Sequence, residues 1–259
     1  MTRLLGLDFA DLGTDAALAM LAARGPGAPF SYLVTPNADH LVRLAREPGR
    51  YGPLYRDAGW RLLDSRVVAR LARVLGLRAP PIAPGSDLTA RLFGEVITPG
   101  DRIALLGGRH STAEAIRARF GLQHLLHHDP PMGFDADPAA FEAALAFLEG
   151  AGARFMFLGV GSPRQEMVAR ALLHRGRARG TALCIGASLL FLSGEERRAP
   201  RSLQRAGLEW AWRLAQDPRR LARRYLVEDP ALLALLWRER WSLRISGARN
   251  PRPQSAPEA

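Results

Sequence analysis

The sequence predicts an α/β fold: a mostly parallel sheet with helices on both faces, followed by a helical C-terminal appendage rich in arginine and tryptophan. Three observations predict it. Short apolar runs typical of buried strands alternate with segments whose apolar residues recur at helical spacing. Glycine or a helix-capping residue marks the junctions. The chain has 259 residues, 47% hydrophobic and 24% charged, which is enough for a sizeable core.

The apolar runs place the strands and the helices between them. Strands are expected at residues 30–34, 61–63, 103–106, 155–158 and 182–185. Helices are expected around residues 41–45, 67–75 and 141–148, and in the appendage at 201–226 and 231–244. Strands that alternate with helices favour a parallel sheet, which binds ligands outside the carboxyl ends of its strands.

Cap residues predict where several helices begin. Ser111 and Ser162 are each followed three residues later by Glu or Gln, the spacing of a capping box. Thr35 and Asp137 are each followed by proline, which is favoured at the first helical position. We therefore expect these four side chains to cap helices.

Positive charge concentrates near the C-terminus. All 36 basic residues are arginine; residues 1–196 hold 22 of them against 19 acidic residues, and residues 197–259 hold 14 against 6. We expect a core at 1–195, a basic, membrane-associating appendage at 196–246 and a disordered tail at 247–259. So basic a segment suits an anionic partner, whether a phosphate, a nucleic acid or a membrane surface.

The compartment follows from three further features. No segment is long and apolar enough to span a bilayer, and acidic residues occupy the place of a signal peptide's apolar stretch. The single cysteine, Cys184, fits a reducing cytoplasm and inert packing. We expect a cytoplasmic protein, peripheral on the inner face of the plasma membrane.

A glycine-rich loop, Gly159-Val-Gly-Ser-Pro-Arg-Gln-Glu166, follows an expected strand and opens a helix. Gly159 and Gly161 allow close backbone approach, and a helix start offers N–H groups to a phosphate. Arg164 opposes the helix dipole unless it faces an anion. The third glycine of a dinucleotide-binding motif is missing, and a structural turn is the alternative.

Polar residues end two other strands. Thr35 and Asn37 are placed to hydrogen-bond a sugar or nucleotide, or to cap the next helix. Asp64 is placed to act as a general base, or equally as an N-cap. Asp135 and Asp137 match a metal-binding D-x-D, but capping explains Asp137, so no metal is expected.

Nine short segments, taken in order, resemble the WecG/TagA/CpsF glycosyltransferase family over about residues 30–226. They are Thr35-Pro-Asn-Ala-Asp39, Gly85-Ser-Asp-Leu88, Leu105-Leu-Gly-Gly108, Pro130-Pro-Met-Gly-Phe134, Gly159–Glu166, Ile185-Gly-Ala187, Arg198-Ala-Pro200, Gly207-Leu-Glu-Trp-Ala-Trp-Arg213 and Pro218-Arg-Arg-Leu-Ala-Arg-Arg-Tyr225. Each is weak alone, but nine in one order are specific.

The resemblance implies a Rossmann-like core and an inverting, metal-independent transfer without a cofactor. The donor is a UDP-sugar, of N-acetylmannosamine or glucose type, and the acceptor is linked to polyprenyl diphosphate. Asp64 is the implied general base, with Thr35 and Asn37 beside the reacting sugar. The implied substrate-binding residues are Asp87, Gly107, Gly108, Gly133, Gly159, Gly161, Arg164, Gln165, Glu166, Arg198, Arg213, Arg220 and Arg223, with the last three on the diphosphate.

One departure and two rival functions remain. Many members have glycine after the aspartate, whereas Ser65 follows Asp64 here, which puts the loop shape and the sugar specificity in doubt. An arginine-rich nucleic-acid-binding module is the main alternative, and a nucleotide-dependent oxidoreductase is another. The tryptophan-rich appendage favours a membrane over nucleic acid. A homo-oligomer is compatible with the sequence.

Overall fold

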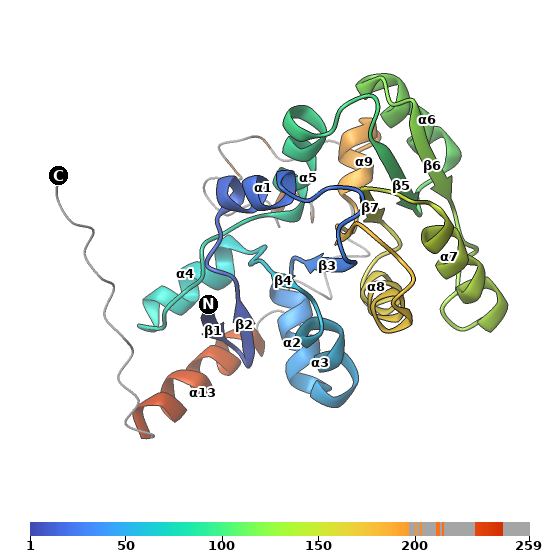
Figure 1. Ribbon diagram of the computed structural model, residues 1–259. Helices are drawn as coiled ribbons and strands as arrows, with labels where there is room; N and C mark the ends of the chain where they lie inside the picture. Colours follow the sequence, from blue (N-terminus) through green and yellow to red (C-terminus); the bar gives the residue numbers. More distant parts are fainter. Residues whose placement is uncertain (197–199, 201–202, 204–210, 213, 215–230, 246–259) are drawn as a thin grey trace.

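The structure is a computed structural model that describes residues 1–196 and 231–245, with residues 200, 203, 211, 212 and 214. A parallel six-stranded sheet lies at its centre (Figure 1). From edge to edge the strands are β4 (Trp60–Arg61), β3 (Ser31–Val34), β8 (Thr181–Cys184), β7 (Phe155–Leu158), β5 (Arg102–Leu106) and β6 (His124–His128). An antiparallel hairpin, β1 (Thr2–Leu4) and β2 (Leu7–Phe9), precedes the sheet. The predicted α/β class is confirmed.

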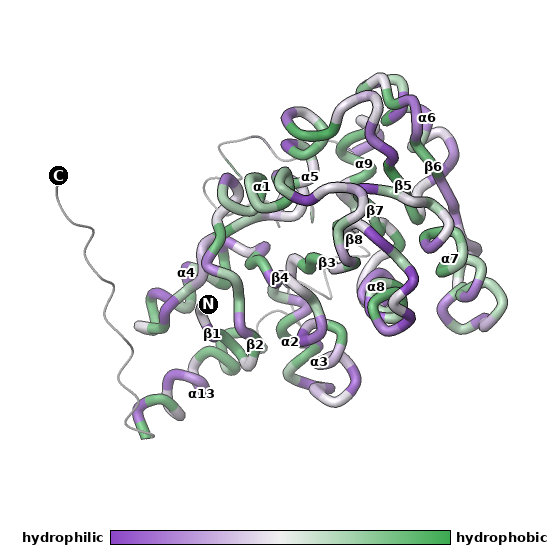
Figure 2. The backbone as a smooth tube through the Cα atoms, viewed as in Figure 1, coloured by the Kyte–Doolittle hydropathy of each residue, from purple (hydrophilic) through white to green (hydrophobic). Residues whose placement is uncertain are grey.

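Helices cover both faces, and each face has its own apolar core (Figures 1 and 2). One core takes residues from α2 (Ala38–Arg46), α3 (Pro48–Arg56), α4 (Arg66–Val74), α7 (Pro138–Gly150), α8 (Arg164–Arg175) and α13 (Ala231–Ile245). The other takes residues from α1 (Thr14–Ala22), α5 (Gly85–Arg91), the π-helical turn η1 (Leu92–Val96), α6 (His110–Phe120) and α9 (Ser188–Ser193).

Strand β7 shows why the predicted strands are continuous apolar runs. Phe155 and Phe157 belong to one core, Met156 and Leu158 belong to the other, and all four are fully buried. A strand covered on both faces has no solvent-facing position for a polar side chain. Its polar neighbours therefore begin where the strand ends.

Four of the five expected strands are confirmed to within a residue at each end. The fifth lies at Trp60–Arg61, with Leu63 in an isolated bridge to Ile82. The expected helices before residue 196 and at 231–244 are confirmed, whereas residues 201–226 fall mostly outside the described ones. Two strand elements were not predicted: β6, whose ends are histidines, and the hairpin, whose strands have three residues each. The helical elements that were not predicted are α1, α3, α5, η1 and α9.

The expected caps had mixed outcomes. Asp137 is confirmed, because its Oδ1 accepts a hydrogen bond from the Ala139 N–H at 2.9 Å. The prediction for Ser111 is wrong, because α6 already begins at the preceding residue. The prediction for Ser162 is wrong too, because α8 begins two residues later without a side-chain cap.

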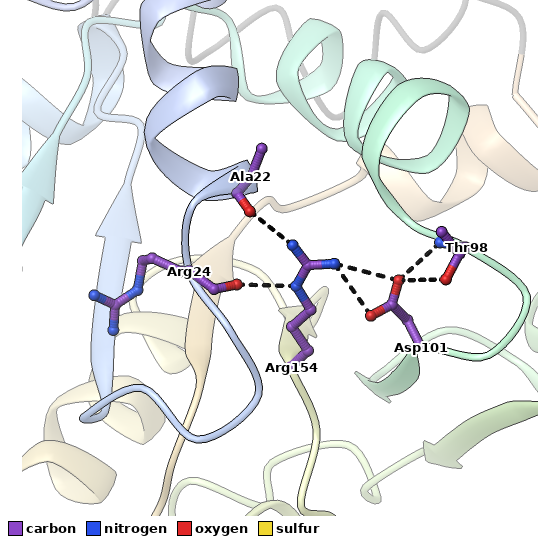
Figure 3. A network of polar contacts seen from close by, with 5 residues as sticks. All are labelled: Ala22, Arg24, Thr98, Asp101 and Arg154. Carbon is purple, nitrogen blue, oxygen red and sulfur yellow. Dashed lines mark hydrogen bonds and ion pairs between the residues drawn. The ribbon is translucent and has the colours of Figure 1, made fainter.

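An arginine at the start of β7 fixes the chain at the amino edge of the sheet (Figure 3). Arg154 donates to the carbonyls of Ala22 and Arg24 at 2.8 and 2.9 Å and pairs with Asp101 at 3.1 Å. Although burial opposes it, hydrogen bonds from Thr98 and Arg154 hold the pKa of Asp101 below its usual value. The network ties the end of α1 to the central strands.

Helix α13 packs against the rest of the molecule, although the sequence predicts an appendage there. Leu232 and Leu236 are buried in the core that α2 and α4 also form. Glu239 Oε2 accepts a hydrogen bond from the backbone N–H of Leu5 at 2.8 Å. Within the residues that the structure describes, no helix is long and apolar enough to cross a membrane. The division at residue 195 stays a prediction.

Substitutions on the buried and the exposed face of α13 should differ in their effect on the free energy of unfolding. We expect Leu236→Ala to lower the free energy of unfolding by about 2–5 kcal/mol, because it leaves a cavity in the core. Leu233→Ala, on the half-exposed side of the same helix, is the matched control and should change it by less than about 1 kcal/mol. Chemical denaturation measures both; equal effects would contradict the packing of α13.

Candidate active site

The loops after the six strands meet at the carboxyl edge of the sheet, because the strands are parallel. This edge brings together the predicted residues that lie before residue 196. In the order of the strands, they are Asp64 after β4; Thr35 and Asn37 after β3; Gly159, Gly161, Arg164, Gln165 and Glu166 after β7; Gly107 and Gly108 after β5; and Gly133 after β6. Asp87 lies half-buried in the first turn of α5.

Asp64 is held by two backbone contacts at the end of β4. Its N–H donates to the carbonyl of Pro36 at 3.1 Å, and its Oδ2 accepts from the Gly85 N–H at 3.2 Å. Thr35 also lies close to Gly85, because a Cβ placed on that glycine would be 2.7 Å from Thr35 Oγ1. Asp64 is half-buried and Thr35 is buried. Thr35, Asp64 and Gly85 therefore form one tight group.

The structure shows which of the polar residues after β3 and β4 cap a helix. Ser65, not Asp64, caps α4, because its side chain accepts from the Val68 N–H at 3.2 Å. Asn37 does cap α2, accepting from the His40 N–H at 3.4 Å, so the cap predicted for Thr35 is wrong. Asp64 does not cap α4, and its role as a general base stays a prediction.

The loops after β5 and β7 are in direct contact. The Gly159 N–H donates to the carbonyl of Leu106, and the Gly107 N–H donates to that of His128, both at 2.8 Å. Gly107 has φ +90°, and a Cβ there would lie 2.8 Å from Val160 Cγ1. Only glycine fits this position, so the two loops pack closely against each other. The close approach of the Gly159–Glu166 backbone to a ligand stays a prediction.

Arg164 connects α8 to the loop after β6. It is the first residue of α8, and its Nη1 lies 3.6 Å from Sδ of Met132. Met132 and Gly133 are exposed, and Gly133 has φ +80°. A guanidinium at a helix N-terminus opposes the helix dipole, and a bound anion would offset this repulsion. The role of Arg164 in binding stays a prediction.

The side chains of Gln165 and Glu166 are buried more deeply than that of Thr35, at 2% and 1% exposure against 7%. Gln165 Nε2 donates to Glu166 Oε1 at 2.8 Å, and Gln165 Oε1 accepts from the Gly186 N–H at 3.0 Å. Burial raises the pKa of Glu166. The role of both residues in substrate binding stays a prediction.

Four predicted arginines, Arg198, Arg213, Arg220 and Arg223, lie outside the described residues. Two neighbours of the site were not predicted. Gly85 contacts Asp64, a contact between segments 21 residues apart that no local pattern encodes. Arg43 of α2 donates to Ser162 Oγ at 3.3 Å, and only its spacing to Asp39 gave a signal.

Metal-binding side chains are a separate question. Among the side chains that the structure describes, no three His, Cys, Asp or Glu residues gather as a metal site. Asp135 is exposed, and Asp137 caps α7. His127 Nε2 lies 2.8 Å from the carbonyl of Gly108.

A parallel α/β sheet that gathers an aspartate, small polar side chains and glycine-rich loops at its carboxyl edge has the arrangement in which enzymes with open α/β sheets bind their ligands. Comparison with known families agrees: residues 2–246 match the family model described as the glycosyl transferase WecG/TagA/CpsF family. The chain belongs to this family of glycosyltransferases, which act in cell-envelope glycan synthesis. The resemblance that the nine segments predict is confirmed.

The contact between Gly85 and Thr35 can be tested by one methyl group. We expect Gly85→Ala to reduce activity at least about tenfold, because the Cβ displaces Thr35 or moves the N–H away from Asp64. Gly94→Ala, where nothing lies within 4 Å of the new Cβ, is the control and should keep wild-type activity. Steady-state kinetics with matched circular dichroism would compare them; similar rates would show that the group is not part of the site.

Proposed function

We propose that this enzyme transfers a sugar of N-acetylmannosamine or glucose type from a UDP-sugar to a polyprenyl-diphosphate-linked acceptor, with inversion and without a metal or other cofactor. One observation carries the proposal. Asp64 is held by backbone groups beside Thr35 at the carboxyl edge of the sheet, in a chain of a glycosyltransferase family. We further propose that exopolysaccharide or another cell-envelope glycan is the product.

Asp64 is the general base in this proposal. Its carboxylate takes the proton of the acceptor hydroxyl as the oxygen attacks the anomeric carbon. The bond from that carbon to the UDP oxygen breaks, and the electron pair leaves with UDP. A single displacement from the opposite face inverts the anomeric centre. Thr35 and Asn37 lie where they can orient the sugar hydroxyls.

Charge develops on the leaving diphosphate, so the site needs positive groups at a distance from the base. The loop after β7 lies three strands from β4, about 14 Å at ordinary strand spacing. It offers the Arg164 guanidinium at the start of α8, where the helix dipole also favours an anion. We infer that Arg198, Arg213, Arg220 and Arg223 add charge there, and that an extended UDP-sugar lies along the edge between Asp64 and this loop.

The outer face of α13 supports a location on the inner, anionic face of the plasma membrane. Leu233, Trp237, Trp241 and Ile245 recur every four residues and are 50–73% exposed. Such a stripe, beside exposed arginines, suits the interface of an anionic bilayer, where the polyprenyl acceptor is located. The partners proposed are therefore the donor, the lipid-linked acceptor and the membrane, and not nucleic acid.

Donor and base can be tested together. We expect one UDP-sugar of a panel to release UDP when a polyprenyl-diphosphate-linked sugar is present in anionic vesicles. Asp64→Asn should lower the rate about 10²–10⁴-fold, because the amide cannot accept the proton. The wild-type rate should persist in EDTA.

Each part of this proposal can fail separately. If Asp64→Asn still releases UDP at the wild-type rate, Asp64 is not the base, but the protein remains a glycosyltransferase that uses a UDP-sugar. Loss in EDTA that Mn²⁺ restores would contradict the metal-independent mechanism. No release from any donor, together with tight and salt-sensitive binding to RNA or DNA, would favour the nucleic-acid alternative.

Membrane association can be tested on α13 itself. We expect Trp237→Ala with Trp241→Ala to reduce co-sedimentation with anionic vesicles at least about tenfold, since tryptophan rings anchor at the bilayer interface. Met132→Ala, also exposed but at the opposite edge of the sheet, is the control. Unchanged co-sedimentation of the double variant would show that this face is not the contact.

A further inference from the structure

A buried polar network lies beneath the loops after β7 and β8, and the chemistry proposed above does not use it. Gln165 and Glu166 occupy the first turn of α8 at 2% and 1% exposure. Burying a carboxyl group without a cation against it costs free energy. We therefore expect the buried carboxyl group of Glu166 to have a structural or functional role.

Gln165 connects the loop after β7 to the loop after β8, and its side-chain amide can do so in only one orientation. Its Oε1 accepts from the Gly186 N–H at 3.0 Å, and its Nε2 donates to Glu166 Oε1 at 2.8 Å. Its own backbone N–H donates to the carbonyl of Gly161 at 3.0 Å. Gly186 follows β8 and Gly161 follows β7, so one residue sets the spacing of these loops.

The acceptor at Glu166 selects that orientation. An amide turned by 180° would point its NH₂ group at the Gly186 N–H, which places donor against donor. Glu166 prevents this because its Oε1 can accept only from the nitrogen end. Among the residues that the structure describes, none forms a hydrogen bond with the second carboxyl oxygen, Oε2, which is buried. Glu166 is 1% exposed, so the protein encloses its carboxyl group.

A neighbouring contact continues the network toward the base side of the site. Arg43 Nη1 donates to Ser162 Oγ at 3.3 Å, and its Nη2 pairs with Asp39 at 2.7 Å. Both residues belong to α2, which Asn37 caps. Burial raises the pKa of Glu166, while Gln165, Ser162 and the Arg43 guanidinium act in the opposite direction. The loop after β7 is thus tied on one side to the β8 loop and on the other to α2.

We propose that Glu166 is a positioning residue for sugar transfer: by accepting from Gln165 Nε2, it holds the Gln165 amide against Gly186 and fixes the two loops that receive the UDP part of the donor. The inference rests on the proposed function. It assigns Glu166 no contact with the substrate, in contrast to the binding role that the family resemblance implies.

The test compares an acceptor with a non-acceptor of similar size at position 166, with UDP as the probe. In Glu166→Gln the new amide oxygen can still accept from Gln165, so UDP affinity should stay within about threefold of wild type. In Glu166→Leu no acceptor remains, and affinity should fall about tenfold. KM for the UDP-sugar should rise by the same factor, with kcat changed less. Both variants should unfold within a few degrees of wild type, since leucine fills the site.

A double-variant cycle makes the test independent of general damage. Once Gln165→Leu has removed the amide, adding Glu166→Leu should lower UDP affinity no further. If Glu166→Leu does not fold, the UDP affinity of Glu166→Gln is compared with that of Gln165→Leu instead. Glu114→Leu, which removes an exposed carboxylate from α6, is the control and should bind UDP as wild type does.

Three results would overturn the proposal: unchanged UDP affinity in Glu166→Leu, an equal loss in Glu166→Gln, or additive losses in the cycle. Its failure differs from failure of the proposed function. If only the role of Glu166 is wrong, the wild type binds UDP and transfers sugar, but the position 166 variants do not behave as stated. If the proposed function is wrong, the wild type itself neither binds UDP nor transfers sugar.

Discussion

The burial of both faces of the central strands decides most of what this molecule can do. Strands β7 and β8 are covered on both sides, so their side chains are excluded from water along their whole length. Helical connections must then cover each face, and every strand points the same way. Polar and charged side chains can appear only where the strands end. In the inner strand β7 the core leaves no place for a polar group, and the candidate site lies at the carboxyl edge, where the strands end.

The same constraint explains how far the sequence alone can predict. Continuous apolar runs identify the inner strands, and the polar residues that follow them, such as Thr35 and Asp64, identify the edge. The hairpin and β6 are missed because short or histidine-ended segments have no such pattern. Ser111 and Ser162 have cap spacing without being caps. A capping pattern is local, and packing shifted the start of each helix by one or two residues.

Tertiary contacts supply what local patterns cannot. The approach of Gly85 to Asp64 depends on how α5 packs at the end of β4, which no window around either residue contains. The bond from Gln165 to Gly186 likewise joins residues 21 positions apart. The packing of α13 is a further example, because no local pattern indicates that Leu236 of this segment, rich in arginine and tryptophan, is buried in the core. The opposite face of α13 is exposed, so the surface proposed to meet the membrane belongs to a helix that packs on the core.

Two carboxyl groups near the sheet edge illustrate how surroundings assign roles to chemically similar side chains. Glu166 is buried, its pKa is raised by that burial, and it contacts Gln165 rather than the edge. Its burial suits the proposed role of orienting a neighbour. Asp64 is half-buried, and a backbone N–H orients one of its oxygens. A general base must be both ordered and accessible, and of these two groups only Asp64 meets both conditions. The difference follows from position: Asp64 ends a strand at the sheet's edge, whereas Glu166 begins a helix that packs over the sheet's face.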